Sequence, residues 1–411
     1  MPEGAVQTVW GGHPESLFLD MDLIVLSPGV SLQVPAVQRA LKRGIPVVGE
    51  LELASWSMPV PTIAVTGTNG KTTTTTLVGE MLKNAGLNPF VGGNIGRPLI
   101  EICAMPGTYR WAVLEVSSFQ LTTAPHFHPS AAAILNIEPD HLDWHPTYED
   151  YVRAKWAITR NMTPKDPLVL FAPLRLKAPV GLRCPVWTFT DGGDETHSAY
   201  IQGEALHWKT GDFSLTFPIR ALRAKQPPVL LDMLAAGLLA HAAGVPGKVI
   251  AETLQAFKSL PHRMESAGEV GGVRFVNDSK ATNVDAVLWA LKSLPGVIVW
   301  LAGGLWKGGD LSVLFPEVEK KVKALVAFGR SAPRFREAFK SLTQTLEVPT
   351  LKEAVAAAYR LARPGDTVLL SPACASFDQF ESYKERGEAF KAMVEALSVK
   401  TREEDHVSAQ G

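Results

Sequence analysis

Short apolar runs alternate along this chain with segments in which apolar positions recur at helical spacing. The first two runs, residues 22–26 and 45–48, flank an amphipathic helical pattern near 34–43, and a Ser-Pro-Gly turn follows the first run. A strand, a helix and a second strand in this order form a βαβ unit, whose two strands are parallel. The start of the chain is therefore predicted to be a parallel α/β layer.

The central part begins with three apolar runs that each end in polar residues, at 62–65, 111–115 and 131–136. Unbroken apolar runs of this length are typical of buried parallel strands. From about 166 to 220 the runs become short and are interrupted by glycine, threonine and tryptophan, which predicts antiparallel strands. An alanine-rich helix is expected over 232–243.

The last part, from Leu260 onwards, again alternates strand and helix patterns, which predicts a second doubly wound domain. Its strands are expected at 273–277, 297–301, 324–328 and 367–371. The polar tail over 400–411 is predicted to be disordered, and no tandem repeat is visible.

Composition excludes several classes of protein. The 411 residues are 46% hydrophobic, with a formal net charge of -1, so cores can form, whereas a nucleic-acid or bulk membrane-surface role lacks the basic excess it needs. Cys103, Cys184 and Cys374 lack the spacing of a disulfide framework or zinc site. The N-terminus has no signal-peptide pattern and no run spans a membrane, so we expect a cytoplasmic protein.

Residues 67–72 read Gly-Thr-Asn-Gly-Lys-Thr directly after the run at 62–65 and before a helical pattern. Glycines let successive N–H groups face a phosphate, the Lys71 ammonium adds charge, and the Thr72 hydroxyl suits Mg²⁺. The strict phosphate-loop pattern has glycine where this chain has Val65, so this is a shortened variant. The alternative is a coincidental turn.

Two further strand ends carry polar residues. Glu115 ends the run at 111–115, where phosphate-loop enzymes place an acid for Mg²⁺; an acidic strand end facing solvent is the alternative. The stretch that follows the next strand contains several potential oxygen and nitrogen ligands, among them Asn136, Asp140 and His141. Lys155 lies fourteen positions beyond His141 in a helical pattern. Taken alone, His141 reads as a structural histidine, but its place after a strand favours a ligand.

The last domain contains two polar stretches after predicted strands. Residues 277–283 read Asn-Asp-Ser-Lys-Ala-Thr-Asn, which can hold a carboxylate or nucleotide, while a helix cap would explain only part of the stretch. Residues 371–383 include Cys374, which has no histidine or other base nearby in sequence. We therefore do not expect it to be a nucleophile.

These motifs together resemble the Mur ligase family, over about residues 27–390. The Gly-Thr-Asn-Gly-Lys-Thr loop is shared across the family, whereas Asp-Ser-Lys-Ala-Thr-Asn and Ser-Pro-Ala-Cys-Ala-Ser-Phe-Asp-Gln-Phe resemble its D-glutamate-adding member. The resemblance implies an α/β protein of three domains: a truncated Rossmann-like N-terminal domain (1–59), a phosphate-loop ATPase domain (60–259) and a Rossmann-like C-terminal ligase domain (260–411).

The resemblance also implies an activity, ATP-dependent amide synthesis that adds D-glutamate to UDP-N-acetylmuramoyl-L-alanine through an acyl phosphate, in peptidoglycan precursor synthesis. Such an enzyme serves cell-wall biogenesis, cell shape and cell division. Its partners are these small molecules, with no nucleic acid and no membrane, and we expect a monomer.

Site residues follow from the same match. The ATP phosphates are expected at Gly67, Thr68, Asn69, Gly70, Lys71 and Thr72, and the rest of ATP at Arg263 and Asp278. Two Mg²⁺ ions are expected, one at Thr72 and Glu115, the other at His141 and a Lys155 carbamylated by CO₂; Lys71, Glu115, His141 and Lys155 are the catalytic set. The substrates are expected at Ser27 and Asn94 (the muramoyl nucleotide), and at Lys280, Thr282, Lys307, Ser376 and Tyr383 (D-glutamate).

Two departures from the family pattern weaken parts of this assignment. The chain starts about half a βαβ unit later than the family's uridine-binding domain, so we expect either an upstream start or an incomplete uridine site. Residues 228–232, Pro-Val-Leu-Leu-Asp, stand where the family has an asparagine motif at the adenine.

Two other functions stay open at this point. One is a related ligase such as folylpolyglutamate synthetase, which shares the phosphate loop but lacks the Asp-Ser-Lys-Ala-Thr-Asn run. The other is a nucleotide-binding paralogue that has lost catalysis and acts as a sensor. The two departures favour the paralogue, and the intact Lys71, Glu115, His141, Lys155 and Lys280 oppose it.

Overall fold

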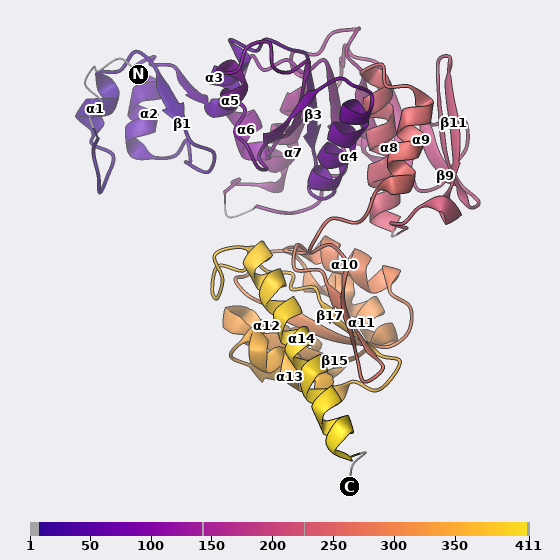
Figure 1. The fold of residues 1–411 in the computed structure, drawn as a ribbon. Helices are drawn as coiled ribbons and strands as arrows, with labels where there is room; N and C mark the ends of the chain where they lie inside the picture. The colour runs from indigo at the N-terminus through magenta and orange to yellow at the C-terminus, as the bar shows by residue number, and fades with distance from the viewer. Residues whose placement is uncertain (1–7, 142–143, 226, 409–411) are drawn as a thin grey trace. The chain divides into compact units, whose positions relative to one another are not determined.

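The computed structural model describes residues 8–141, 144–225 and 227–408 (Figure 1). The chain forms two compact units. The first contains residues up to 137 together with 149–217 and 233–253, and the second contains 138–148, 218–232 and the chain from 254 onwards. Among the described residues, no helix has both the length and the apolar character that crossing a membrane requires.

The N-terminal part of the first unit is a small parallel α/β layer. Strands β1 (Ile24–Leu26) and β2 (Val47–Gly49) pair in parallel, and α2 (Pro35–Lys42) connects them. Helices α1 (Glu15–Leu19) and α3 (Glu50–Ser55) flank this layer in the chain. Alternate strand residues point inward and pack on the apolar face of α2, so the core forms from both elements. This confirms the predicted βαβ unit.

A nine-stranded sheet forms the centre of the first unit. Its order is β11-β10-β9-β8-β7-β6-β3-β5-β4, and neighbouring strands from β4 through β9 in this order pair in parallel. The strands are β3 (Thr62–Thr66), β4 (Pro89–Gly93), β5 (Trp111–Glu115), β6 (Ala131–Ile134), β7 (Leu168–Phe171), β8 (Val186–Thr190), β9 (Ala199–Gln202), β10 (Ala205–Thr210) and β11 (Phe213–Pro218). The strands predicted at 62–65, 111–115 and 131–136 are confirmed.

The prediction of antiparallel strands over 166–220 is wrong for the first part of that range. β7, β8 and β9 continue the parallel sheet, and β10 is the strand that pairs antiparallel, with β9. Glycine, threonine and tryptophan mark where these short strands end, but they carry no information on strand direction. The crossover after β7 is a short 3₁₀ segment, η2 (Ala172–Lys177), which has no helical periodicity to detect.

Helices in the middle of the chain include a long one at the phosphate loop and a buried one after the sheet. They are α4 (Lys71–Asn84), α5 (Ile100–Cys103), α6 (Ser118–Thr122), α7 (Tyr148–Trp156), α8 (Pro227–Ala242) and α9 (Gly247–Ala256). Helix α8 confirms the alanine-rich helix predicted over 232–243 and starts five residues earlier, at a proline, which suits a first helical turn.

The sheet of the second unit has the order β12-β13-β17-β14-β15-β16, parallel except for the edge strand β12. Its elements are β12 (Glu265–Val270), β13 (Val273–Asn277), α10 (Val284–Ser293), β14 (Ile298–Gly303), α11 (Phe315–Lys321), β15 (Val322–Phe328), α12 (Ala332–Phe339), β16 (Gln344–Val348), α13 (Leu351–Leu361), β17 (Thr367–Leu370) and α14 (Tyr383–Ser408). Two apolar cores cover its two faces, which confirms the doubly wound domain.

Three features of the second unit differ from the sequence prediction. Strands β12 and β16 are additional, and their largely exposed, polar sequences explain why no apolar run marks them. The tail predicted as disordered from Lys400 continues α14 to Ser408, while 409–411 lie outside the described residues.

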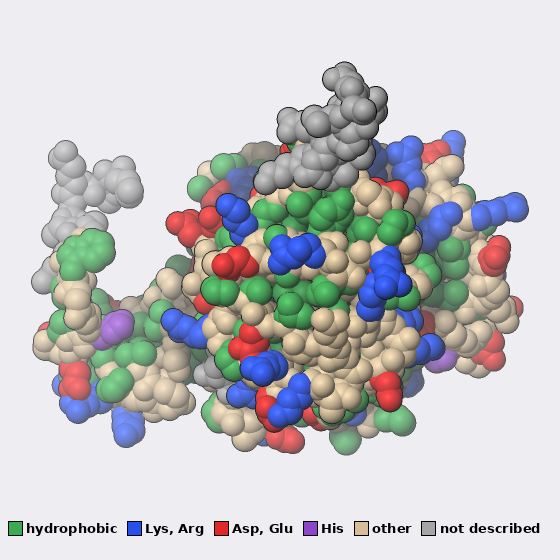
Figure 2. All heavy atoms as spheres, turned by 90° about the horizontal axis from the view of Figure 1, so that it is seen from below, with side chains coloured by type: hydrophobic (Ala, Val, Ile, Leu, Met, Phe, Trp, Pro, Cys, Tyr) green, Lys and Arg blue, Asp and Glu red, His purple; other side chains and the backbone are tan. Residues whose placement is uncertain are grey.

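The molecular face drawn in Figure 2 carries lysines and arginines interspersed with acids. No large area of this face has charge of a single sign, in keeping with the net charge of -1. On this face, therefore, binding of an anion depends on individually placed cations.

Candidate functional site

The phosphate-loop backbone has the shape that an anion site needs. Gly67 has φ +151° and Gly70 has φ +85°, and a Cβ added at Gly67 would lie 3.1 Å from the Cβ of Leu135. Helix α4 begins at Lys71, and its N-cap Gly70 provides no side-chain hydrogen bond. The start of α4 therefore favours a phosphate oxygen through the direction of its backbone N–H groups and of the helix dipole.

Asn136, immediately after β6, holds this loop in place. Its Oδ1 accepts hydrogen bonds from the backbone N–H groups of Thr68 (3.1 Å) and Asn69 (2.8 Å), and its Nδ2 donates to the Asn69 carbonyl (3.0 Å). The sequence analysis counted Asn136 only among several potential ligands and did not predict that it holds the loop. A polar residue just beyond a buried parallel strand is the signal that points to it.

Two lysines converge on the carbonyl of Gly67. Lys71 Nζ donates to it and to the carbonyl of Thr68, both at 2.8 Å, and Lys155 Nζ donates to it at 2.8 Å. Lys155 is buried, and its Nζ lies 4.5 Å from the centroid of the Tyr151 ring, whose hydroxyl lies 2.9 Å from Thr68 Oγ1. Residues 84 positions apart therefore meet at the loop, and Tyr151 is a site residue that sequence reasoning missed.

Glu115 ends β5 beside the start of α4. Its Oε2 accepts a hydrogen bond from Thr72 Oγ1 and its Oε1 accepts one from Asn94 Nδ2, both at 2.8 Å. Asn94 also donates its backbone N–H to the Glu115 carbonyl at 2.8 Å. Because Glu115 is only 2% exposed, the alternative of an acidic strand end facing solvent is excluded.

These oxygen ligands fit Mg²⁺. Within the described ranges, no group of three or more His, Cys, Asp or Glu side chains could hold a metal ion. Mg²⁺ does not need such a cage, because it commonly binds one or two carboxylates and completes its shell with water and substrate phosphates. The carboxylate of Glu115 and the hydroxyl of Thr72 at the phosphate loop are such a donor set.

His141 and Asp140 belong to a segment that packs with the second unit. Asp140 Oδ1 lies 3.6 Å from Lys307 Nζ, and its Oδ2 accepts from Asn283 Nδ2 at 3.3 Å. Burial by itself would raise the pKa of Asp140, but Lys307, His141 and the Asn283 hydrogen bond lower it overall. His141 has φ +55°, a left-handed conformation that is uncommon for a residue with a side chain.

Asp278 is a buried acid directly after β13. Its carboxylate accepts hydrogen bonds from Ser371 Oγ (3.0 Å) and from the Met264 N–H (3.2 Å). Burial nevertheless raises the pKa of Asp278 to about 7, because these two bonds and the nearby Arg263 compensate only part of the desolvation cost. A strongly shifted acid of this kind is typical of functional sites.

Arg386 connects the two polar stretches of the second unit. Its Nε and Nη2 donate to the Oγ (2.9 Å) and carbonyl (2.8 Å) of Ser279, and Nη2 also donates to the Cys374 carbonyl (3.1 Å). Ser279 Oγ in turn donates to the Tyr383 carbonyl, and Lys280 Nζ lies 4.0 Å from the centroid of the Tyr383 ring. The structure thus brings Lys280 and Tyr383 together. Sequence reasoning missed Arg386, since an arginine at a helix start reads as a solvated charge.

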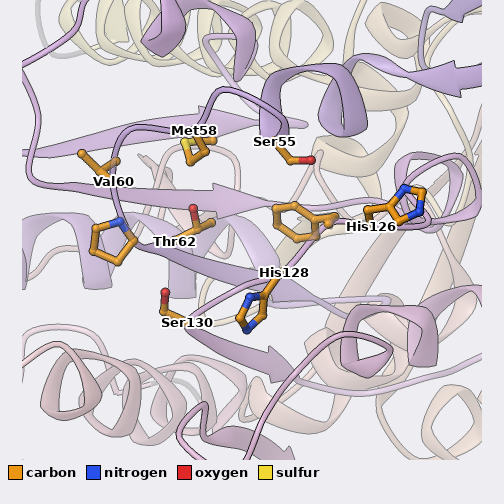
Figure 3. A pocket seen from close by; sticks show the side chains of 9 residues that line it. Ser55, Met58, Val60, Thr62, His126, His128 and Ser130 are labelled. Atoms are coloured by element: carbon orange, nitrogen blue, oxygen red, sulfur yellow. The ribbon is translucent and has the colours of Figure 1, made fainter.

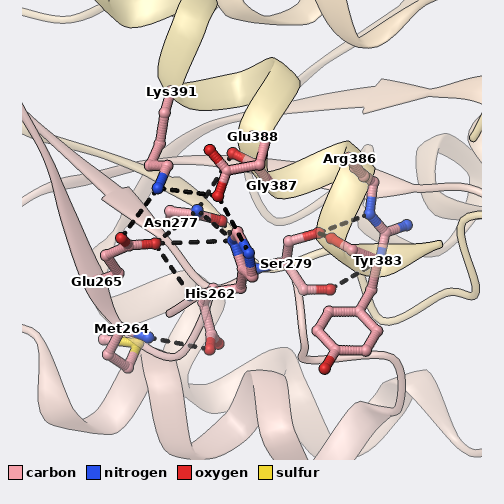
Figure 4. A network of polar contacts seen from close by, with 11 residues as sticks. His262, Met264, Glu265, Asn277, Ser279, Tyr383, Arg386, Gly387, Glu388 and Lys391 are labelled. Atoms are coloured by element: carbon pink, nitrogen blue, oxygen red, sulfur yellow. Dashed lines mark hydrogen bonds and ion pairs between the residues drawn. The ribbon is translucent and has the colours of Figure 1, made fainter. Parts of the chain in front are cut away.

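His262 forms the other half of this network (Figure 4). It is buried at φ +63°, its Nδ1 lies 3.0 Å from Asn277 Nδ2, and its carbonyl accepts the Lys280 N–H at 3.1 Å. A Cβ at Gly387 would lie 2.2 Å from His262 Nδ1, so glycine is required there. The turn before β12 is thereby held against the stretch that follows β13.

For the remaining predicted site residues, the structure gives the burial of the side chains and a few backbone contacts. Ser376 is buried and its carbonyl accepts the N–H groups of Gln379 and Phe380, while Thr282 and Arg263 are half-buried. Ser27 is exposed at a turn closed by the Val30 N–H. Residues 228–232 form the first turns of α8, and Asp232 is buried there.

Cys374 is unsuited to nucleophilic chemistry. Its side chain is fully buried, and burial raises the pKa of the thiol to about 12 despite the nearby Ser331 hydroxyl and Arg386. A thiolate therefore does not form near neutral pH, as we expected from the sequence.

A cavity of about 240 Å³ lies elsewhere in the first unit, at the amino ends of β3 and β6 (Figure 3). His126 and His128 line it, and each pairs with an acid: His126 Nδ1 with Glu52 and His128 Nε2 with Asp166, both at 2.8 Å. The phosphate loop follows the carboxyl end of β3. The cavity therefore contains none of the predicted site residues.

Three family models match the chain in succession. The Mur ligase MurD-like N-terminal domain matches residues 1–49, the Mur ligase middle domain matches 65–220, and the Mur ligase glutamate ligase domain matches 262–374. Each match lies inside one of the three domains expected from the sequence, whose boundaries at 59/60 and 259/260 stay predictions.

Curated proteins match over nearly the full chain. The UDP-N-acetylmuramoylalanine--D-glutamate ligase of Pelotomaculum thermopropionicum is 44% identical over 95% of this chain and 87% of that protein. The chain belongs to the Mur ligase family. The ligase of the same name from Koribacter versatilis is 40% identical over 94% of this chain and 86% of that protein.

Solved structures of Mur ligases share the fold. MurF ligase from Thermotoga maritima, solved in complex with ADP, has a TM-score of 0.64 at 18% identity and covers 93% of this chain and 99% of that chain. A pseudomurein peptide ligase type C from Methanothermus fervidus has a TM-score of 0.64 at 18% identity, covering 94% and 89%. Mur ligases depend on ATP and Mg²⁺, which agrees with the donor set at the phosphate loop.

Proposed function

We propose that this chain is an ATP-dependent ligase that adds D-glutamate to UDP-N-acetylmuramoyl-L-alanine in peptidoglycan precursor synthesis. The observation that carries the proposal is 44% identity, over 95% of the chain, to a ligase of that name. The phosphate loop, the buried Glu115 and the Lys280–Tyr383 pair support it from the chemistry of the residues themselves.

In the first step, a carboxylate oxygen of the muramoyl-alanine attacks the γ-phosphorus of ATP, and the bond to ADP breaks to leave an acyl phosphate. The N–H groups at the start of α4 and the Lys71 ammonium stabilise the charge on the transferred phosphoryl group. The Nζ of Lys71 donates hydrogen bonds to carbonyls of its own loop, which holds it within reach of a phosphate bound there. Thr72 and Glu115 would hold Mg²⁺, which would supply charge neutralisation between the two reacting anions.

In the second step, the amine of D-glutamate attacks the acyl carbon, phosphate leaves, and the nitrogen loses a proton to give the amide. Lys280, Thr282, Lys307, Ser376 and Tyr383 are proposed to hold the amino acid. An ammonium group and hydroxyls suit its two carboxylates. Arg263 and Asp278 are proposed to contact ATP, and Ser27 and Asn94 the muramoyl nucleotide.

We further propose a second Mg²⁺ at His141 and at Lys155 in its carbamylated form. For this, the neutral amine of Lys155 would attack the carbon of CO₂ and lose a proton to give a carbamate anion, whose hard oxygen would suit Mg²⁺. The place of Lys155 supports this, because it is buried and its Nζ lies 2.8 Å from the Gly67 carbonyl of the phosphate loop. The three domains, 1–59, 60–259 and 260–411, a monomeric state, a cytoplasmic location and a role in cell division belong to the same proposal.

Product analysis tests the proposed specificity. The protein is incubated with ATP, Mg²⁺ and UDP-N-acetylmuramoyl-L-alanine, together with D-glutamate, L-glutamate or D-alanine in separate reactions. Mass spectrometry should detect an amide product with D-glutamate in preference to the others. A further reaction contains ATP, Mg²⁺, a folate and L-glutamate, and a product there would favour the folylpolyglutamate alternative. No product in any of the reactions would favour the sensor.

A further inference from the structure

The crossover between β7 and β8 presents two apolar side chains at its tip. Leu176, in η2, is 96% exposed, and Val180, in the turn that follows, is 104% exposed. The base of the same crossover is anchored by Leu174 and Cys184, which are 6% and 7% exposed. The segment is thus tied to the sheet at both ends, and no described residue covers its apolar tip.

Cations flank this tip in the sequence. Arg175, Lys177 and Arg183 are exposed, and the sequence contains no Asp or Glu between Asp166 and Asp191. Among the described residues, none forms a salt bridge with these three side chains. The chain as a whole has a net charge of -1, so this is a local concentration of positive charge on an otherwise balanced protein.

The shape of the tip decides between a protein and a lipid partner. A protein interface needs a broad complementary surface, and its apolar anchors fit into pockets. Leu176 and Val180 instead stand out from the molecule. They do not border the cavity of about 240 Å³, the kind of pocket that could receive a partner's side chain, since it is lined by other segments, 55–62 and 126–130. Protruding apolar side chains flanked by lysine and arginine are the arrangement that inserts into the interface of an anionic bilayer.

We propose that residues 172–184 form a contact site for an anionic lipid surface. Leu176 and Val180 enter the interface between head groups and acyl chains, while Arg175, Lys177 and Arg183 lie beside the lipid phosphates. Such binding is peripheral and reversible, and it goes beyond the proposed ligase activity, which needs no membrane. It refines the conclusion from composition, since this crossover carries a local basic excess that the net charge of the whole chain does not show.

Vesicle flotation tests the site. The full chain is mixed with vesicles of phosphatidylglycerol and phosphatidylcholine, or of phosphatidylcholine alone, and the bound fraction is measured at rising salt. The wild type should bind the anionic vesicles and be released by salt, because exposed charges are screened. The double variant Leu176→Glu/Val180→Glu, and separately Arg175→Gln/Lys177→Gln, should lower the partition coefficient by about tenfold or more.

Matched variants outside the crossover control for folding and for total charge. Val297→Glu places a charge at another exposed apolar residue, and Lys352→Glu removes an exposed cation elsewhere; both should bind as the wild type does. All variants should keep wild-type ligase rates without vesicles, which separates failure of this site from failure of the proposed function. Equal binding to the two kinds of vesicle, or unchanged binding of Leu176→Glu/Val180→Glu, would overturn the proposal. Salt-sensitive capture by a soluble polyanion without vesicle binding would also overturn it, in favour of an acidic partner.

Discussion

Thr72 Oγ1 donates a 2.8 Å hydrogen bond to Glu115 Oε2, which links the first turn of α4 to the end of β5. The two residues are 43 positions apart, and they meet because β3, which leads into α4, pairs directly with β5. A hydroxyl and a carboxylate are thereby placed side by side at the phosphate loop. Such preorganisation lets a metal bind without a large rearrangement of the protein.

Glu115→Gln should lower kcat by about a hundredfold or more and raise the Mg²⁺ concentration needed for half-maximal rate, because it removes the only charge of this donor pair. The amide keeps the shape of the side chain, so the melting temperature should change little. Rates measured across a Mg²⁺ titration check this. Glu101→Gln, which alters a half-exposed acid in α5, serves as the control. A Glu115→Gln enzyme with wild-type Mg²⁺ dependence would contradict the assignment.

Lys71→Ala should reduce turnover by several orders of magnitude while leaving the fold intact, since its ammonium stabilises the transferred phosphoryl group. Its hydrogen bonds to the carbonyls of Gly67 and Thr68 are local to the loop, so a small change in melting temperature is expected. Lys83→Ala removes an exposed lysine from the same helix and should leave the rate unchanged. If Lys71→Ala keeps more than about a tenth of wild-type activity, the phosphate-loop assignment is wrong.

Lys155→Ala should be nearly inactive and should recover part of its activity with small carboxylic acids. Truncation leaves a space beside Gly67 and Tyr151, and an added carboxylate can carry the missing charge towards Mg²⁺. Depleting bicarbonate should slow the wild type as well. Lys165→Ala, at an exposed position, should show neither effect. A wild type insensitive to bicarbonate, together with an active Lys155→Ala enzyme, would remove the carbamate from the account.

Asp278→Asn should stabilise the protein more at about pH 8 than at about pH 5. The pKa of this acid is about 7 in the folded state against 3.8 in the unfolded chain, so the folded state loses relative stability as pH rises through that window. Above about pH 7 the loss of folding free energy no longer grows with pH, and it amounts to at most roughly 4 kcal/mol. Asparagine is neutral throughout and avoids it.

Melting temperatures of the wild type and Asp278→Asn at the two pH values measure this difference, with the exposed Asp212→Asn as control. The KM for ATP should rise at the same time if Asp278 contacts the nucleotide. If the melting temperature of Asp278→Asn lies below that of the wild type by the same amount at both pH values, the carboxylate stabilises the fold instead.

The sequence predicts the parts of this protein that depend on local pattern. The phosphate loop, the buried strands β3, β5 and β6, and the doubly wound second unit all follow from apolar runs and glycine placement. The direction of β7 to β9 cannot be predicted in this way, because short parallel and antiparallel strands have the same composition. Their pairing is decided by partners that are distant in the sequence.

The same limit applies to the site. Residues next to a motif were found from the sequence, whereas the roles of Asn136, Tyr151 and Arg386 depend on contacts with segments that are 67 to 107 positions away. Arg386 lies in a polar helix start and only its burial reveals its role. Long-range hydrogen bonds of this kind have no local signature.

Phosphate release measured with each co-substrate omitted in turn tests the central claim most directly. An acyl-phosphate ligase should not transfer phosphate to water when its acceptor or amine is missing, because the complete set of bound substrates assembles the reactive site. The account predicts rapid phosphate release only with ATP, Mg²⁺, UDP-N-acetylmuramoyl-L-alanine and D-glutamate together. Equal release without D-glutamate, or without the muramoyl nucleotide, would contradict it.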